Sequence, residues 1–220
     1  MEIAYSDIIS GYFEFPTDNA RRLLPAHLEP FELHHGSSIL SVTVLDAPTS
    51  PAGPHRQILM GVAVVPLVKG DGPLPKAAVY PYMVATNNAM VRQFAGSLFH
   101  LPHWNEDVTI DVAKSGRSIT GTVKAGADTV VELTVSEYEW EPADFLYQCF
   151  TKDASGAYVG NVRLKGELSE HEEETGKLVL QDHPFNTGLL IADVYDVPFR
   201  EVWTRKAAQT FEPLVQLQLT

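Results

Sequence analysis

Between residues 105 and 141, apolar and polar residues alternate in the way that is typical of β-strands with one buried face. The first alternating run extends from Val108 to Val112, and the alternation resumes after each of two turns, Ser115-Gly116-Arg117 and Gly126-Ala127-Asp128. Glycine-containing turns between alternating runs are typical of hairpins. This segment therefore predicts three antiparallel strands in a meander.

Further strand-like runs lie on both sides of the meander. They are predicted at residues 11–15, 38–45, 57–68, 79–85, 158–169, 177–181 and 214–219. A large sheet with few helices is best stabilised by closing on itself, because closure hides the strand edges and encloses an apolar interior. We predict an α+β fold that is mostly antiparallel β, with a cone-like or barrel-like closed sheet and two or three helices.

Three segments have helical features. A helix is predicted at residues 18–24, with Thr17 as its N-cap. A short helical turn is expected at residues 186–190. A longer helix is predicted after Asn87, whose side chain can accept hydrogen bonds from the free amides of a helix start. Pro102 forbids its continuation. The apolar residues that recur there at helical spacing are Val91, Phe94, Ala95 and Leu98.

Three stretches in the first half of the chain resemble the acetoacetate decarboxylase-like superfamily. They are the eight residues Leu23-Leu24-Pro25-Ala26-His27-Leu28-Glu29-Pro30, the strand start Gly53-Pro54-His55-Arg56-Gln57-Ile58, and the strand, helix and turn from Tyr80 to Trp104. They occur in the order that the superfamily has. The resemblance implies its cone-like barrel, a small-molecule substrate and assembly into a homo-oligomer.

The chain departs from this superfamily at the positions that carry its chemistry. Relatives read Gly-Phe-Pro-Lys-Lys, in which the first lysine forms the Schiff base, and aligning Pro102 with that proline puts His103 at the lysine position. Trp104 then replaces the second lysine, and Gln57 replaces a carboxylate. Imidazole cannot form an iminium, and the remaining lysines, such as Lys76 in a Gly/Pro-rich loop, are poor substitutes. This alignment excludes Schiff-base chemistry at His103.

Histidine can still transfer protons, because its unperturbed pKa lies near 6.5. The resemblance implies that His103 acts as the acid/base while Gln57 and His55 polarise a substrate oxygen. The alternative for His103 is a loop residue that is bonded to a backbone carbonyl, and the alternative for Gln57 is a solvent-facing strand position. The implied substrate-binding residues are Trp104, Tyr82 and Arg92.

Charge and composition narrow the classes of partner. The chain has 16 basic and 28 acidic residues and a net charge of −12, which repels nucleic acid and anionic lipid surfaces. The longest apolar run, residues 58–68, falls short of the ~20 residues that cross a bilayer. We expect neither a nucleic-acid partner nor a membrane span.

No linker divides the chain, so we expect one domain over residues 1–220. The acidic N-terminal residues do not resemble a secretory signal, and the single cysteine, Cys149, excludes an internal disulfide. These features favour a cytoplasmic location.

The spacings that are typical of metal and nucleotide sites are missing from the sequence. It contains neither His-Glu-x-x-His nor Cys-x-x-Cys, and no glycine-rich phosphate loop follows a strand. We therefore expect no bound metal and no cofactor.

The combined features favour a small-molecule metabolic enzyme that acts on a keto or enolisable substrate by acid/base catalysis without a Schiff base. Its reaction would be of lyase, hydratase, isomerase or cyclase type. One alternative is a non-catalytic protein that keeps the cavity and binds a small molecule. Another is a structural subunit whose partner carries the activity.

Overall fold

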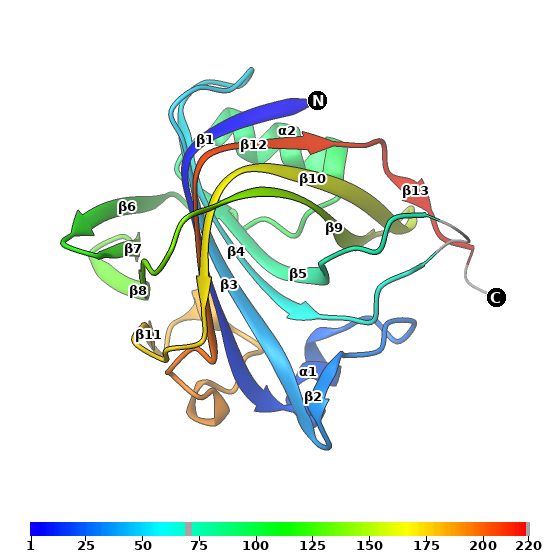
Figure 1. The fold of residues 1–220 in the computed structure, drawn as a ribbon. Helices are drawn as coiled ribbons and strands as arrows, with labels where there is room; N and C mark the ends of the chain where they lie inside the picture. The colour runs from blue at the N-terminus through cyan, green and yellow to red at the C-terminus, as the bar shows by residue number, and fades with distance from the viewer. Residues whose placement is uncertain (69–71, 219–220) are drawn as a thin grey trace.

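The computed structural model describes residues 1–68 and 72–218, except for the side chain of Ala95. Its main body is a closed barrel of seven strands (Figure 1). Around the barrel, the order is β1 (Glu2–Pro16), β12 (Arg200–Phe211), β10 (Gly156–His171), β9 (Glu141–Asp153), β5 (Ala77–Thr86), β4 (His55–Ala63) and β3 (Ser37–Ala47).

Pairing of β3 with β1 closes the barrel, and adjacent strands are antiparallel except for β5 and β9, which are parallel. Two short strands extend this sheet: β2 (Glu32–His34) pairs with β3, and β13 (Val215–Gln216) pairs with β10. The predicted closed, mostly antiparallel sheet is confirmed.

A second sheet of four strands packs against the outside of the barrel. It consists of β6 (Val108–Ser115), β7 (Ser118–Ala125), β8 (Asp128–Ser136) and β11 (Lys177–Leu180). The first three form the predicted meander, with its turns at the two predicted glycines. The main hydrophobic core lies between the two sheets and includes Phe13, Leu40, Ile58, Ile110 and Leu133, all of which are almost completely buried.

On strands β1, β3 and β4, one face packs against the second sheet and the other faces the barrel interior, because side chains alternate along a strand. Phe13 on β1 and Ile58 on β4 point into the core between the sheets, whereas Tyr12 and Gln57, one residue away, line the barrel interior. This arrangement leaves the interior of the barrel available for a site.

Helix α1 (Thr17–Leu23) follows β1, and α2 (Ala89–Phe99) lies at the other end of the barrel (Figure 1). Both helices were predicted, but neither predicted N-cap was correct. The Thr17 hydroxyl bonds to Ser38 at 2.9 Å, so α1 has no side-chain cap. Asn88, not Asn87, caps α2. None of the described helices is long and apolar enough to span a membrane.

The structure also changes the bounds of two other predicted elements, the helical turn at residues 186–190 and the C-terminal strand. Instead of a helical turn at residues 186–190, two 3-10 turns occur, η1 (Pro184–Asn186) and η2 (Ile191–Asp193). The predicted C-terminal strand at 214–219 is limited to β13, and its last residue lies outside the described residues. Strands β2, β9 and β12 were not predicted.

Candidate functional site

The barrel encloses a cavity of about 230 Å³. Every barrel strand contributes side chains to its wall, and Val91 and Phe94 of α2 cover one end. Of these two, Val91 is buried and Phe94 is 44% exposed, so the predicted apolar face of α2 is only partly covered. The cavity is therefore formed by the inner face of the barrel and a helix at its mouth.

His55 lies at the α2 end of this cavity and is only 5% exposed. Its Nδ1 atom lies 3.1 Å from the Gly53 carbonyl oxygen. Burial lowers the pKa of His55 below its ordinary value, although the contact with Gly53 and the charge of Asp46 oppose this shift. A neutral ring that donates through Nδ1 keeps its Nε2 lone pair free to accept a proton.

Gln57 lies two residues further along β4 and lines the same cavity. Alternate residues of a strand share a face and lie about 7 Å apart. The Gln57 side chain has no hydrogen-bond partner in the described part of the chain, although the residue is only 9% exposed. Its amide can therefore donate to, or accept from, a molecule in the cavity.

Asn88 fixes the loop before His55 to the start of α2. Its side-chain oxygen accepts from the amides of Met90 and Val91 at 2.9 and 3.2 Å. Its side-chain nitrogen donates to the carbonyls of Ala52 and Pro54 at 3.3 and 3.1 Å. The same residue thus caps the helix and positions the turn that supports the His55 ring.

His103 lies in a separate, more open pocket beside α2. The residues that line it include Arg92, Gln93, Ser97 and Asn105, and Leu101 lines both this pocket and the barrel cavity. Both ring nitrogens of His103 are buried without a partner in the described residues. Burial and the positive charge of Arg92 lower the pKa of His103 to about 4. The imidazole is therefore neutral at pH 7.

Acidification is expected to destabilise the fold through His103. Between its folded pKa of about 4 and the unfolded value near 6.5, the unfolded chain binds a proton that the folded chain does not. Stability should therefore fall as the pH is lowered through this interval. Denaturant unfolding at about pH 7 and pH 4.5 should show a smaller loss for His103→Gln than for the wild type. Equal losses would contradict this assignment.

Arg92 is anchored by its guanidinium, which donates to the Asn105 carbonyl at 2.5 Å and to the Asp107 carboxylate at 2.8 Å. Its Nε atom is buried without a partner among the described residues. The structure therefore brings Arg92 and His103 together, and it places them apart from the cavity that His55 and Gln57 line.

Tyr82 and Trp104 pack against the core between the two sheets. The Trp104 ring lies 5.4 Å from that of Phe185. The Tyr82 hydroxyl and the Trp104 indole nitrogen are both buried without a partner in the described residues. Of the six residues that the sequence implied, these two contact the hydrophobic core.

Sequence reasoning missed several polar residues of the cavity, including Tyr12, Tyr147 and the pair Ser10 and Thr43, whose hydroxyl oxygens are 2.8 Å apart. Tyr12 could have been found, because it lies in a predicted strand. Tyr147 could not, because β9 was not predicted. Among the described residues, no group of three histidine, cysteine or acidic side chains is placed to hold a metal ion.

Neither a family model nor a curated protein matches the chain in sequence. Solved structures match it in fold. An acetoacetate decarboxylase-like enzyme from Sphingomonas wittichii RW1 has a TM-score of 0.67 at 14% identity, covering 100% of this chain and 93% of that chain. Acetoacetate decarboxylase from Legionella pneumophila has a TM-score of 0.66 at 13% identity, covering 99% and 86%.

A third match is the enduracididine biosynthesis enzyme MppR in complex with pyruvate. It has a TM-score of 0.61 at 14% identity, and the alignment covers 99% of this chain and 91% of that chain. At identities this low, the three matches establish the fold and not the reaction.

Proposed function

We propose that this chain, which has the acetoacetate decarboxylase-like fold, is an enzyme that transfers a proton on a small ketone or other enolisable substrate. The substrate would occupy the barrel cavity, and no Schiff base would form. The observation that carries this proposal is a buried His55 on the cavity wall beside Gln57, whose side chain has no partner among the described residues. An acid/base and a carbonyl-binding amide are the two groups that enolisation requires.

In the proposed reaction, Nε2 of His55 removes a proton from the carbon next to the carbonyl. The electron pair of that C–H bond moves to the carbonyl oxygen, which becomes an enolate and accepts a hydrogen bond from the Gln57 amide. The Gly53 carbonyl then accepts from Nδ1 of the imidazolium, as it does from the neutral ring. Transfer of this proton to the enolate oxygen gives the enol. If the proton on Nε2 first exchanges with solvent, its delivery to the carbon completes a hydrogen exchange.

The cavity lining supports a mechanism without a Schiff base. Among the described residues that line it, none is a lysine, and most of the exposed lining is apolar. The names of the matched proteins add support, because one is an acetoacetate decarboxylase and another binds pyruvate. Acetoacetate and pyruvate are both keto acids, so ketone chemistry is compatible with a barrel of this fold.

Exchange of substrate protons with solvent deuterium tests the proposal, because it detects enolisation whatever the complete reaction is. The wild type should accelerate exchange in at least one member of a panel of small ketones and keto acids, measured by proton NMR. His55→Gln should reduce the accelerated rate by roughly 10²–10⁴-fold, while the melting temperature stays near that of the wild type. Unchanged exchange in this variant would reject the role of His55.

His103→Gln is the matched control. Because His103 lies in the pocket beside α2, this variant should keep most of the exchange rate. Loss of exchange in His103→Gln and its retention in His55→Gln would instead support His103 as the acid/base, as the sequence resemblance implied. Borohydride reduction with acetoacetate or pyruvate should leave the protein mass unchanged, and a lysine adduct would overturn the proposed mechanism.

A second candidate is a non-catalytic protein that binds a small apolar or keto-bearing molecule. The apolar wall of the cavity supports this candidate, because burial of apolar ligand surface requires no catalytic group. Retention of a small molecule through purification, with no exchange in any of the ketones that bind, would identify it.

A further inference from the structure

The geometry points to a second polar subsite in the barrel cavity, at the end away from His55. We propose that the hydroxyls of Tyr12 and Tyr147 form it and donate hydrogen bonds to an oxygen at the far end of an elongated, mostly apolar ligand. This inference depends on the proposed function in one respect, which is that the ligand occupies the same cavity.

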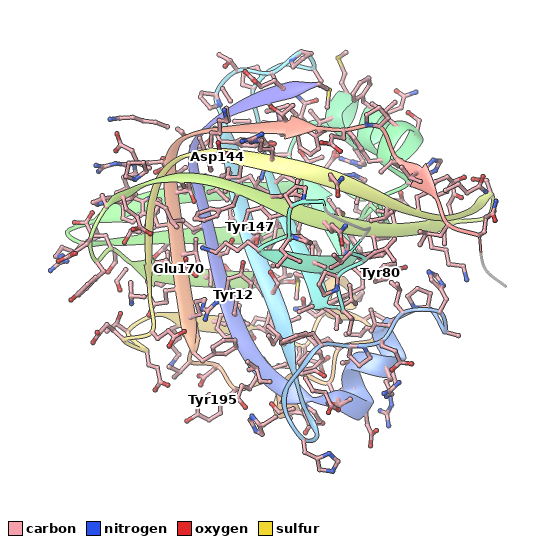
Figure 2. The ribbon with its side chains drawn as sticks, turned by 45° about the vertical axis from the view of Figure 1, so that its right-hand side comes forward. Tyr12, Tyr80, Asp144, Tyr147, Glu170 and Tyr195 are labelled. Atoms are coloured by element: carbon pink, nitrogen blue, oxygen red, sulfur yellow. The ribbon has the colours of Figure 1, made fainter. Side chains whose placement is uncertain are left out.

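Tyr12 and Tyr147 belong to β1 and β9, and their side chains gather with Glu170 of β10 in the same part of the barrel (Figure 2). Both tyrosines line the cavity. Neither hydroxyl has a hydrogen-bond partner in the described part of the chain, and neither is sealed from open space. A phenol that lines a cavity without a partner is available to a ligand.

The two hydroxyls are held as donors by their surroundings. Burial and the negative charge of Glu170 raise the pKa of Tyr12 to about 12, although the nearby Arg200 opposes this shift. Burial raises the pKa of Tyr147 still further, with added contributions from Tyr12 and Glu170. Both phenols therefore keep their protons at neutral pH and can donate to a ligand oxygen.

Glu170 is held in place by two cations. Its carboxylate contacts the Lys76 ammonium, which lies 4.0 Å above the Phe145 ring. Its other oxygen lies 3.6 Å from Arg200. Glu170 thus pairs with these cations, and among the described residues no hydrogen bond joins it to either tyrosine hydroxyl.

The register of the barrel separates the two polar ends of the cavity. Tyr12 pairs with Ser41 of β3, and Ser41 pairs with Gly61 of β4. Gly61 is four residues from Gln57, which corresponds to about 13 Å along a strand. Leu59 lies between them on β4 and packs with Leu45 and Leu164. At the same level, the hydroxyls of Ser10 and Thr43 bond to each other. The ligand that fits has an apolar middle and an oxygen function at each end.

Benzylacetone and its para-hydroxy derivative test this inference, because both carry the ketone and only the second carries an oxygen at the far end. Isothermal titration of the wild type should show that the hydroxylated ketone binds about tenfold more tightly, the effect expected of one or two hydrogen bonds. The double variant Tyr12→Phe/Tyr147→Phe should bind the two ketones equally, with the affinity for benzylacetone changed less than about twofold.

Tyr195→Phe serves as the matched control, because this tyrosine is 65% exposed and lies away from the other two in Figure 2. It should keep the preference of the wild type. An unchanged preference in the double variant, no preference in the wild type, or no binding of either ketone would overturn the inference. Because His55→Gln should keep the preference while losing exchange, failure of the proposed reaction would be distinguishable from failure of this subsite.

Discussion

Replacement of Glu201 by alanine is expected to lower the free energy of unfolding by about 3–5 kcal/mol. Glu201 is 0% exposed. Its carboxylate accepts hydrogen bonds from three backbone amides, those of Ser136, Thr175 and Gly176, at distances of 2.7, 2.8 and 2.7 Å. Removal of the carboxylate would leave these three donors without this acceptor, and the amide of Gly176 is buried. A buried donor without a partner costs about 1–3 kcal/mol.

The position of Glu201 explains why its replacement should lower the stability of the whole fold. It lies on β12 of the barrel, whereas Ser136 ends β8 of the second sheet and Thr175 precedes β11. The carboxylate thus joins the two sheets at one point. Urea unfolding should show the loss in Glu201→Ala. The exposed carboxylate of Glu172, which pairs with Arg200, provides the control, and Glu172→Ala should change stability by less than about 1 kcal/mol. Similar losses in both variants would contradict this account.

Substitution of Gly121 by valine is expected to cost about 2–3 kcal/mol. Gly121 is a residue of β7 in the second sheet, and a Cβ at this position would lie 2.9 Å from Cγ2 and 3.1 Å from Cβ of Val44 on the barrel. The missing side chain lets the two sheets approach each other. A valine would push β7 away from β3, and the close packing of the core would be lost.

A double-mutant cycle separates this steric effect from the β-propensity of valine. Val44→Ala creates space opposite Gly121, so the double variant should be at least about 1 kcal/mol more stable than the sum of the single effects predicts. Gly96→Ala in α2 is the control, because a Cβ there would meet nothing within 4 Å. This control should be neutral or stabilising by up to about 1 kcal/mol. Additive effects in the cycle would show that the two residues are not in steric conflict.

Much of the fold could be predicted from the sequence because local signals were strong where strands have one polar face. The meander from Val108 to Ser136 alternates clearly, and its turns contain glycine. The resemblance to acetoacetate decarboxylase-like proteins, carried by three short stretches, is confirmed at the level of the fold.

Strands β9 and β12 could not be recognised for a physical reason. In β9, Tyr147 lines the cavity while Phe150 packs in a cluster on the other face, so apolar residues occur on both sides and do not alternate with polar ones. In β12, the buried Glu201 interrupts the apolar pattern, although its charge is satisfied by contacts that no local pattern shows. Tertiary structure supplies the environment that makes these segments strands.

The candidate site was predicted in part. The sequence identified His55 and Gln57 as neighbours on one face of a strand, and both line the barrel cavity. It could not predict that His103 and Arg92 share a different pocket, because that separation depends on the path of the chain after α2. The contribution of Tyr147 depends on the pairing of β9 with β10 and β5, which brings together residues far apart in the sequence.

The closure of the barrel has a consequence for its biosynthesis. Glu2 of β1 pairs with Thr210 of β12, so the ring of strands cannot be completed before residues 200–211 have left the ribosome. Contacts between such distant parts of a chain form slowly, because a long loop must be closed first. Until then, β1 and β10 expose the edges that β12 later covers. Molecular chaperones that shield exposed strands would therefore be most useful to this protein until β12 has been synthesised.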